Sequence, residues 1–255
     1  MNSRTRYGQL DFEYMTPRER AIARLQQFEP PEGYWLAYSG GVDSDAALLL
    51  CELADVKHEA HHNLTTCDAP EVIRHIRTHP KIIIDRPPQS MWRMIQTNGL
   101  PTRLHRWCCR ELKERGGAGR LVITGVRWDE SIRRRQRQMV EPCRQGKGRT
   151  FLHPIIDWTR AEVWDLIRAH GNSYCSLYDE GWKRIGCVLC PMVRDSAAHI
   201  ERWPKIAAAW KSAAFRYWQK GTPGVRKFES PESFWQWWID RDAHLPSEYE
   251  QRLFD

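Results

Sequence analysis

The sequence lacks the long apolar runs that would place the chain in or across a membrane. Its 255 residues contain no uninterrupted apolar stretch of about 18 residues. The first residues, Met1 to Arg4, lead into polar sequence and not into the apolar centre of a secretory signal. Internal repeats and low-complexity tracts are absent as well. We therefore expect a cytoplasmic globular protein that makes no contact with membranes.

Charge and cysteine are plentiful in the chain. Charged residues make up 28% of it and the formal net charge is +7. The positive charge is local, because residues 101–150 hold 14 lysines and arginines against five acidic residues. Such a concentration of arginines attracts polyanions. A solvated helix face, or a pocket that binds only a nucleotide triphosphate, would give the same charge pattern. Eight cysteines in a reducing compartment favour metal sites or catalysis over disulfides.

Short apolar runs alternate with helical patterns along most of the chain, which predicts an α/β fold with a doubly wound, mainly parallel sheet. Residues 1–32 form a helical lead-in, 33–192 an α/β domain, and 193–255 a small, tryptophan-rich helical appendage. We expect a fully buried strand at 82–85 and an edge segment at 151–156, since Pro154 cannot donate to a ladder. The predicted helices are 70–78, 90–97 and 160–169, the last with a capping box of Thr159 and Glu162.

The stretch Tyr34 to Leu50 organises the domain. An apolar run ends in Ser39-Gly40-Gly41, and Asp43-Ser44 opens a helical pattern. Two adjacent glycines allow positive φ and a close approach to a ligand, so this strand–turn–helix predicts a phosphate site. Neither a Walker loop nor a dinucleotide fingerprint fits its spacing. A glycine-rich turn without a ligand is the alternative.

Two separated cysteine pairs, Cys108-Cys109 and Cys187-x-x-Cys190, form a set of four thiols. Thiolates favour zinc or an iron–sulfur cluster. The vicinal pair favours a cluster, because adjacent side chains point in different directions and one zinc ion usually takes ligands from wider spacings. Zinc and free core thiols stay open as alternatives.

The hexapeptide Ser39-Gly40-Gly41-Val42-Asp43-Ser44 resembles the pyrophosphate loop (PP-loop) of the N-type ATP pyrophosphatases, which have an adenine nucleotide α-hydrolase-like fold. The resemblance implies that these six residues and Gly125 bind ATP, while a nucleophile attacks the α-phosphate. Ser39, Asp43, Ser44 and Arg127 would then be catalytic, with Asp43 helping to hold Mg²⁺.

The cysteine pattern is similar to that of the assimilatory adenylylsulfate reductases, within the broader phosphoadenosine-phosphosulfate-reductase-like family. This resemblance implies a [4Fe–4S] cluster held by Cys108, Cys109, Cys187 and Cys190. The reductases need a nucleophilic cysteine in a C-terminal tail, and no cysteine follows Cys190 in this sequence. We therefore expect an ATP pyrophosphatase that adenylylates an acceptor for sulfur transfer, as in DNA phosphorothioation systems. A sulfonucleotide reductase with an external thiol donor, and a non-enzymatic DNA-binding sensor, are the alternatives.

The same resemblance gives the basic segment a role. Its arginines and lysine would follow the backbone of DNA or tRNA, and a cysteine desulfurase is the expected sulfur donor. Homo-oligomerisation is left open. The C-terminal tryptophans fit a core or a partner interface better than base stacking. The predicted nucleic-acid contacts are Arg133, Arg134, Arg135, Arg137, Arg144, Lys147 and Arg149.

Overall fold

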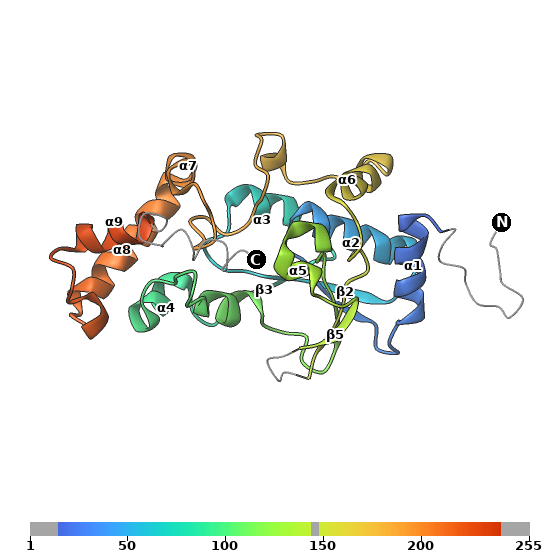
Figure 1. The fold of residues 1–255 in the computed structure, drawn as a ribbon, viewed down its shortest axis with the longest axis horizontal. Helices are drawn as coiled ribbons and strands as arrows, with labels where there is room; N and C mark the ends of the chain where they lie inside the picture. The colour runs from blue at the N-terminus through green and yellow to red at the C-terminus, as the bar shows by residue number, and fades with distance from the viewer. Residues whose placement is uncertain (1–14, 144–147, 241–255) are drawn as a thin grey trace, which may run out of the picture.

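A computed structural model describes residues 15–143 and 148–240. The predicted nucleic-acid residues Arg144 and Lys147 lie outside the described residues. The described part is an α/β body with a cluster of helices, α7, α8 and α9, at the end of the molecule opposite α1 (Figure 1). The helices are α1 (Pro17–Gln27), α2 (Val42–Leu53), α3 (Pro70–Arg77), α4 (Met91–Asn98), α5 (Ile132–Arg135), α6 (Arg160–Ala169), α7 (Ser196–Arg202), α8 (Pro204–Gln219) and α9 (Pro231–Ile239).

The six strands form one sheet in the order β3-β2-β1-β4-β6-β5. All neighbouring strands are parallel except β5, which runs antiparallel to β6. This confirms the predicted, mainly parallel sheet. The chain leaves β1 toward β2 and returns to β4 on the other side, so the strand order reverses between β1 and β4, where ligands bind in such sheets. The strands are β1 (Tyr34–Ala37), β2 (His58–Asn63), β3 (Ile83–Asp85), β4 (Leu121–Ile123), β5 (Val140–Pro142) and β6 (Thr150–Leu152).

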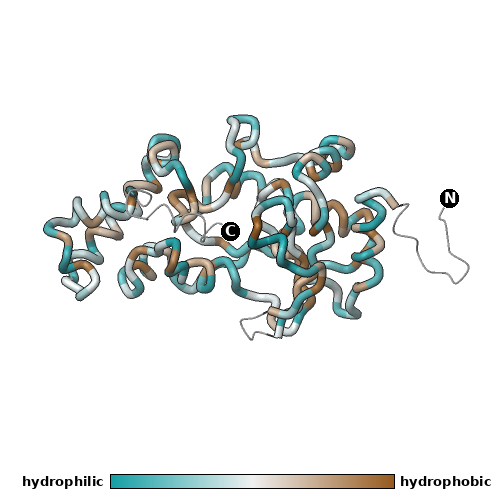
Figure 2. The backbone as a smooth tube through the Cα atoms, viewed as in Figure 1, coloured by the Kyte–Doolittle hydropathy of each residue, from teal (hydrophilic) through white to brown (hydrophobic). Residues whose placement is uncertain are grey.

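Local sequence signals place the helix starts correctly. Helix α6 occupies the predicted residues, and the Thr159 and Glu162 side chains form the predicted capping box. Helix α2 has buried residues on almost every side because it lies between the sheet and α6. Figure 2 shows the contrast with α5, whose turn is hydrophilic. The strongly apolar helix that follows the glycine turn is therefore the central packing element.

Two strand predictions were wrong in position. Strand β3 was expected to be fully buried, but it is the edge of the sheet and Ile83 is 45% exposed. The segment 151–156 was expected at an edge, but β6 lies between β4 and β5 and ends at Leu152, before Pro154. Short apolar runs do not report how many neighbours a strand has, and the proline constrains only the residues after the strand.

The predicted helical C-terminal region is present, and its tryptophans are mostly core. Trp203, Trp210, Trp235 and Trp238 are each at most 9% exposed. Helix α8 packs on α4, and α9 packs on α8. These buried rings are unavailable for stacking on bases. In the described ranges, no helix combines the length and apolarity needed to cross a bilayer.

Candidate functional site

Serine side chains shape the loop that joins β1 to α2, which we call the SGGVDS loop (Ser39–Ser44). The backbone N–H of Ser39 donates to Ser44 Oγ at 3.2 Å, and Ser44 Oγ donates to the Gly41 carbonyl at 2.7 Å. The hydroxyls of Ser39 and Ser44 lie 3.2 Å apart. The loop is thus closed on itself at the N-terminus of α2. The helix start presents N–H groups and the positive end of the helix dipole there, an arrangement suited to phosphate.

Two glycines are required by close approaches at this loop. Gly40 has φ +76°, and a Cβ on it would lie 2.9 Å from Val72 Cγ1 on α3. Gly125, which follows β4, would place a Cβ 2.7 Å from the carbonyl oxygen of Asp43. Gly125 was predicted to bind the nucleotide; the structure shows that it lets the chain after β4 pass directly against the start of α2. The absence of a side chain at both positions therefore allows α3 and the chain after β4 to pack directly against the loop.

Buried Arg127 and half-buried Asp43 form an ion pair at the mouth of the loop. Arg127 is 3% exposed, and its Nε donates to Asp43 Oδ1 at 2.7 Å. Arg134 on α5 lies near both and also pairs with Glu130. Burial and the neighbouring charge of Arg184 lower the pKa of Arg134 to about 10, so it still carries its charge at neutral pH. The loop mouth is therefore a network of ion pairs, in which Arg127 also contacts Asp129 at 3.3 Å.

One segment connects this loop to the cysteines. The hydroxyl of Tyr178 accepts a 3.1 Å hydrogen bond from the backbone N–H of Val42. A Cβ on Gly41 would lie 3.9 Å from Ile185 Cγ1. Two residues later the same segment reaches Cys187, which is buried. The SGGVDS loop and the cysteines are thus joined by a short stretch of chain.

The four cysteines predicted as ligands line one cavity, together with a fifth thiol that sequence reasoning missed. Cys67 is fully buried, and its spacing from the other cysteines does not mark it as a ligand in the sequence. Its neighbour in the cavity is Cys187, and the hydroxyl of Thr65 lies 3.4 Å from each of their sulfurs. We call this space the thiol cavity; its lining residues are Thr65, Cys67, Met91, Cys108, Cys109, Lys113, Cys187, Cys190, Pro191 and Trp210.

The thiol cavity separates its sulfurs into thiols and thiolates. A hydrogen bond from Cys67, supported by the charge of Lys113, lowers the pKa of Cys187 to about 6. A hydrogen bond from Cys108, again with Lys113, lowers the pKa of Cys109 to about 7. In turn, the nearby thiolates, Cys187 first, raise the pKa of Lys113. Each cysteine pair therefore supplies one anionic sulfur near neutral pH, and metals bind thiolates.

Backbone strain gathers around the same cavity. Cys109–Lys113 is a π-helix, a rare form that is frequent at functional sites. Thr66 and Leu189 have φ of +66° and +54°, and they adjoin Cys67 and Cys190. Only one other non-glycine residue in the described ranges, Asp55, has positive φ. Such strain costs of order 1–3 kcal/mol per residue and clusters where function holds it in place.

The predicted nucleic-acid residues divide into three kinds. Arg133 and Arg135 are exposed on α5. Arg134 and Arg137 are half-buried, and Arg134 faces the loop mouth. Arg149 is a correction: it is 6% exposed and donates to the carbonyls of residues 114 and 116, so it is a structural residue and not a surface contact. Sequence alone cannot separate these cases, because all lie in one basic run.

Comparison with known proteins identifies the family of this chain. The phosphoadenosine phosphosulfate reductase domain matches residues 33–193. The chain belongs to this family. Within the phosphoadenosine phosphosulfate reductase domain family, an adenosine 5'-phosphosulfate reductase of Staphylococcus haemolyticus is 30% identical over 103 residues, which cover 38% of the chain and 42% of that protein.

More of the chain matches an uncharacterized protein of Methanocaldococcus jannaschii, MJ0973, at 26% identity over 214 residues, or 79% of the chain and 51% of that protein. The chain spans about half the length of the curated relatives it matches. The phosphoadenylyl-sulfate reductase from Candida auris superimposes with a TM-score of 0.53 and 17% identity over 69% of this chain and 89% of that one. That likeness shows the shared fold.

Proposed function

We propose that the protein binds ATP with Mg²⁺ at the SGGVDS loop and transfers the adenylyl group to an acceptor, with release of pyrophosphate. The observation that carries the proposal is the loop mouth: the start of α2, Asp43 and the buried Arg127 converge there, with Arg134 alongside. A triphosphate needs both cationic donors and a carboxylate for its metal. An anion-only pocket would not require Asp43.

The chemistry follows from this arrangement. An acceptor oxygen attacks the α-phosphorus, the bond to the β-phosphate oxygen breaks, and pyrophosphate leaves. Arg127 and Arg134 stabilise the negative charge that develops during this step. Arg127 is held by Asp43 and by the carbonyl of Trp158 at 3.4 Å, so it is oriented before substrate binds. The outer sulfur of a persulfide then displaces AMP from the acceptor, and a second thiol cleaves the resulting S–S bond, forming a disulfide with the donor and leaving the sulfur on the acceptor.

The thiol cavity fits an iron–sulfur cluster. Four sulfurs at Cys108, Cys109, Cys187 and Cys190 face one buried space beside Lys113, and two of them have lowered pKa values. We assign these four as the ligands of a [4Fe–4S] cluster. When bound, the cluster supplies a redox-active centre close to the nucleotide site. Lys113 offsets the negative charge of the thiolates.

The acceptor in this proposal is a nucleic acid. Arg133 and Arg135 are exposed beside the loop mouth, and Trp128 is 40% exposed close to them, which offers phosphate contacts and a stacking surface together. The expected product is a sulfur-modified DNA or tRNA, with sulfur from the persulfide of a cysteine desulfurase. Mass spectrometry of total DNA and tRNA nucleotides, with and without the protein, identifies it.

The test of ATP use is release of pyrophosphate. Asp43→Asn should lower Mg²⁺-dependent release by at least about tenfold, because it removes the carboxylate for the metal while keeping the side-chain shape. Asp165→Asn is the matched control, since that carboxylate is 74% exposed on α6; it should leave release unchanged. Pyrophosphate release that survives Asp43→Asn in a folded variant would contradict the proposal.

A sulfonucleotide reductase that uses an external thiol is the second candidate. The match to adenosine 5'-phosphosulfate reductases and the thiol cavity favour it. Sulfite release from adenylylsulfate in the presence of a small dithiol would establish this reaction in place of ATP use. Tight duplex binding with neither activity would indicate a non-enzymatic DNA-binding protein.

A further inference from the structure

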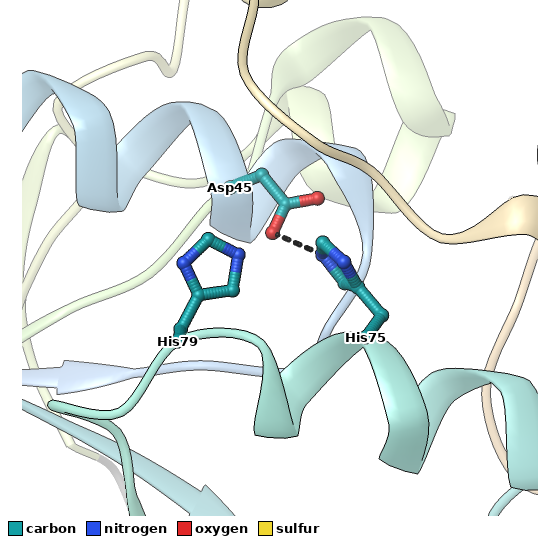
Figure 3. A group of neighbouring side chains, drawn as sticks. All are labelled: Asp45, His75 and His79. Atoms are coloured by element: carbon teal, nitrogen blue, oxygen red, sulfur yellow. Dashed lines mark hydrogen bonds and ion pairs between the residues drawn. The ribbon is translucent and has the colours of Figure 1, made fainter.

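A buried group of one carboxylate and two imidazoles lies behind the SGGVDS loop. Asp45 is on the first turn of α2, His75 is on α3, and His79 follows the end of α3. Figure 3 shows both rings directed toward the carboxylate. One ligand atom from each residue lies within 4.8 Å of the other two. Neither the proposed nucleotide site nor the thiol cavity uses any of these three side chains.

Two atoms of this group have no hydrogen-bond partner among the described residues. Asp45 is 2% exposed, and its Oδ2 is buried and unpartnered. The Nε2 of His79 is also buried and unpartnered. Asp45 Oδ1, in contrast, contacts His75 Nε2 at 3.0 Å and accepts from the hydroxyl of Tyr38. Leaving a buried ring nitrogen unsatisfied beside a buried carboxylate is costly, and a cation held by Asp45 and His79 would give that nitrogen a partner.

We propose that Asp45, His75 and His79 bind a divalent transition-metal ion, Zn²⁺ first. Two imidazoles and one carboxylate are a common ligand set for zinc. The two histidines are four residues apart, a spacing that places them on one face at the end of a helix. The hydroxyl of Tyr38 contacts Asp45 Oδ1 and His75 Nε2 and so lies next to the proposed ligand atoms. No sulfur lies in this ligand set.

The distances suit an ion. Metal–ligand bonds of about 2.1 Å hold two ligand atoms at most about 4.2 Å apart. Ligand atoms within 4.8 Å therefore need only small side-chain rotations to close around the ion. The competing interpretation is a hydrogen-bond network in which His75 pairs with Asp45. That network accounts for Oδ1 of Asp45 but leaves the buried, unpartnered Nε2 of His79 unexplained.

The proposed ion would hold the start of α2, which follows the SGGVDS loop, in a fixed position relative to α3. Asp45 directly follows Ser44 on α2, and the α3 residues Val72 and Ile76 pack against Gly40. An ion joining Asp45 to His75 and His79 would therefore tie the start of α2 to α3. Its role is positioning, and it takes no part in the reaction. The inference stands independently of the proposed function.

The test is metal analysis of the full chain purified anaerobically, combined with X-ray absorption spectroscopy at the zinc edge, which identifies the ligand atoms. We expect zinc with only nitrogen and oxygen ligands, in addition to any iron. His79→Gln and Asp45→Asn should each lower this zinc by at least about tenfold. His170→Gln is the matched control, because that histidine is exposed at the end of α6; its zinc content should equal that of the wild type.

A measurement on the wild type covers the case in which a variant fails to fold. Zn²⁺ added to chelator-treated protein should raise the melting temperature by roughly 5 °C or more, and the spectrum should show nitrogen and oxygen ligands. Zinc bound only through sulfur would place the metal in the thiol cavity and overturn the proposal. So would an unchanged melting temperature, or full zinc content in a folded His79→Gln variant.

Discussion

The SGGVDS loop and the thiol cavity lie close together but are built in different ways. The loop is six consecutive residues closed by their own serines. The cavity is assembled from segments far apart in sequence, and Trp210 of α8 forms part of its wall. The first is encoded locally, so its shape can be recognised in the sequence. The second exists only when the C-terminal helices are packed in place.

This difference changes how the C-terminal region is understood. Trp210 Nε1 donates to the carbonyl of Val188 at 3.1 Å, and the N–H of Leu189 donates to His199 Nδ1 at 3.1 Å. Both contacts hold the two residues between Cys187 and Cys190. The helices beyond residue 193 are therefore the outer support of the thiol cavity, more than an appendage to the α/β body.

The largest expected effect separates the cavity from the rest of the cysteines. Cys187→Ser should remove most bound iron, by at least about tenfold, because a serine hydroxyl is a poor ligand for this soft metal site. Cys143→Ser is the control: that thiol lies outside the cavity, so iron should be retained. Iron and sulfide analysis with visible absorption measures both. Equal iron in the two folded variants would show that the cavity binds no cluster.

The sequence predicted what is local and missed what is brought together by packing. The capping box of Thr159 and Glu162, the glycine turn and the mainly parallel sheet all follow from neighbouring residues or from simple alternation. The sequence predicted four of the five cysteines that line the thiol cavity, because their spacing reveals two pairs. It gave no reason to select Cys67. Nothing near Cys67 in the sequence marks it, and only the pairing of residue 68 with Cys187 brings it there.

Arginine roles show the same limit. Arg134 and Arg149 occur in one basic run, yet Arg134 faces the loop mouth and the buried Arg149 donates to backbone carbonyls. A run of basic residues predicts a positively charged surface. It does not predict which of the arginines is buried and hydrogen-bonded to the backbone. The group of Asp45, His75 and His79 is a related case. Asp45 lies 30 residues before His75, and a separation of this length does not predict a contact without the fold.

A glycine pair tests how strictly the loop is built. Gly40→Ala should destabilise the protein by about 2–4 kcal/mol, since its φ of +76° costs an alanine about 1–2 kcal/mol and the new Cβ collides with Val72. Gly171→Ala shares the strain, at φ +61°, but a Cβ there meets nothing within 4 Å. Denaturant unfolding of both variants therefore isolates the packing contribution. Equal losses would mean that α3 yields easily and that the loop is not held tightly.

Electrostatics gives the last contrast between the two regions. In the thiol cavity, the charge of Lys113 helps to lower the pKa values of Cys187 and Cys109. Near the loop, burial and the charge of Arg137 lower the pKa of His153 to about 4. His153 is fully buried, and its Nδ1 lies 2.7 Å from Thr124 Oγ1. In the unfolded chain this histidine takes up a proton near pH 6.5, but the folded protein resists it until about pH 4.

The unfolded state therefore binds more protons in that window, and His153 makes stability fall as the pH drops from about 6.5 to 4, by up to about 1.4 kcal/mol per pH unit. His153→Gln, which can keep the hydrogen bond to Thr124, should remove this contribution and flatten the profile of unfolding free energy against pH. His170→Gln, at an exposed site, should retain the wild-type slope. A His153→Gln profile as steep as the wild type would show that other groups govern acid sensitivity on this side of the sheet. A flattened profile would show that the buried His153, whose pKa is lowered first by burial and then by Arg137, governs this acid sensitivity.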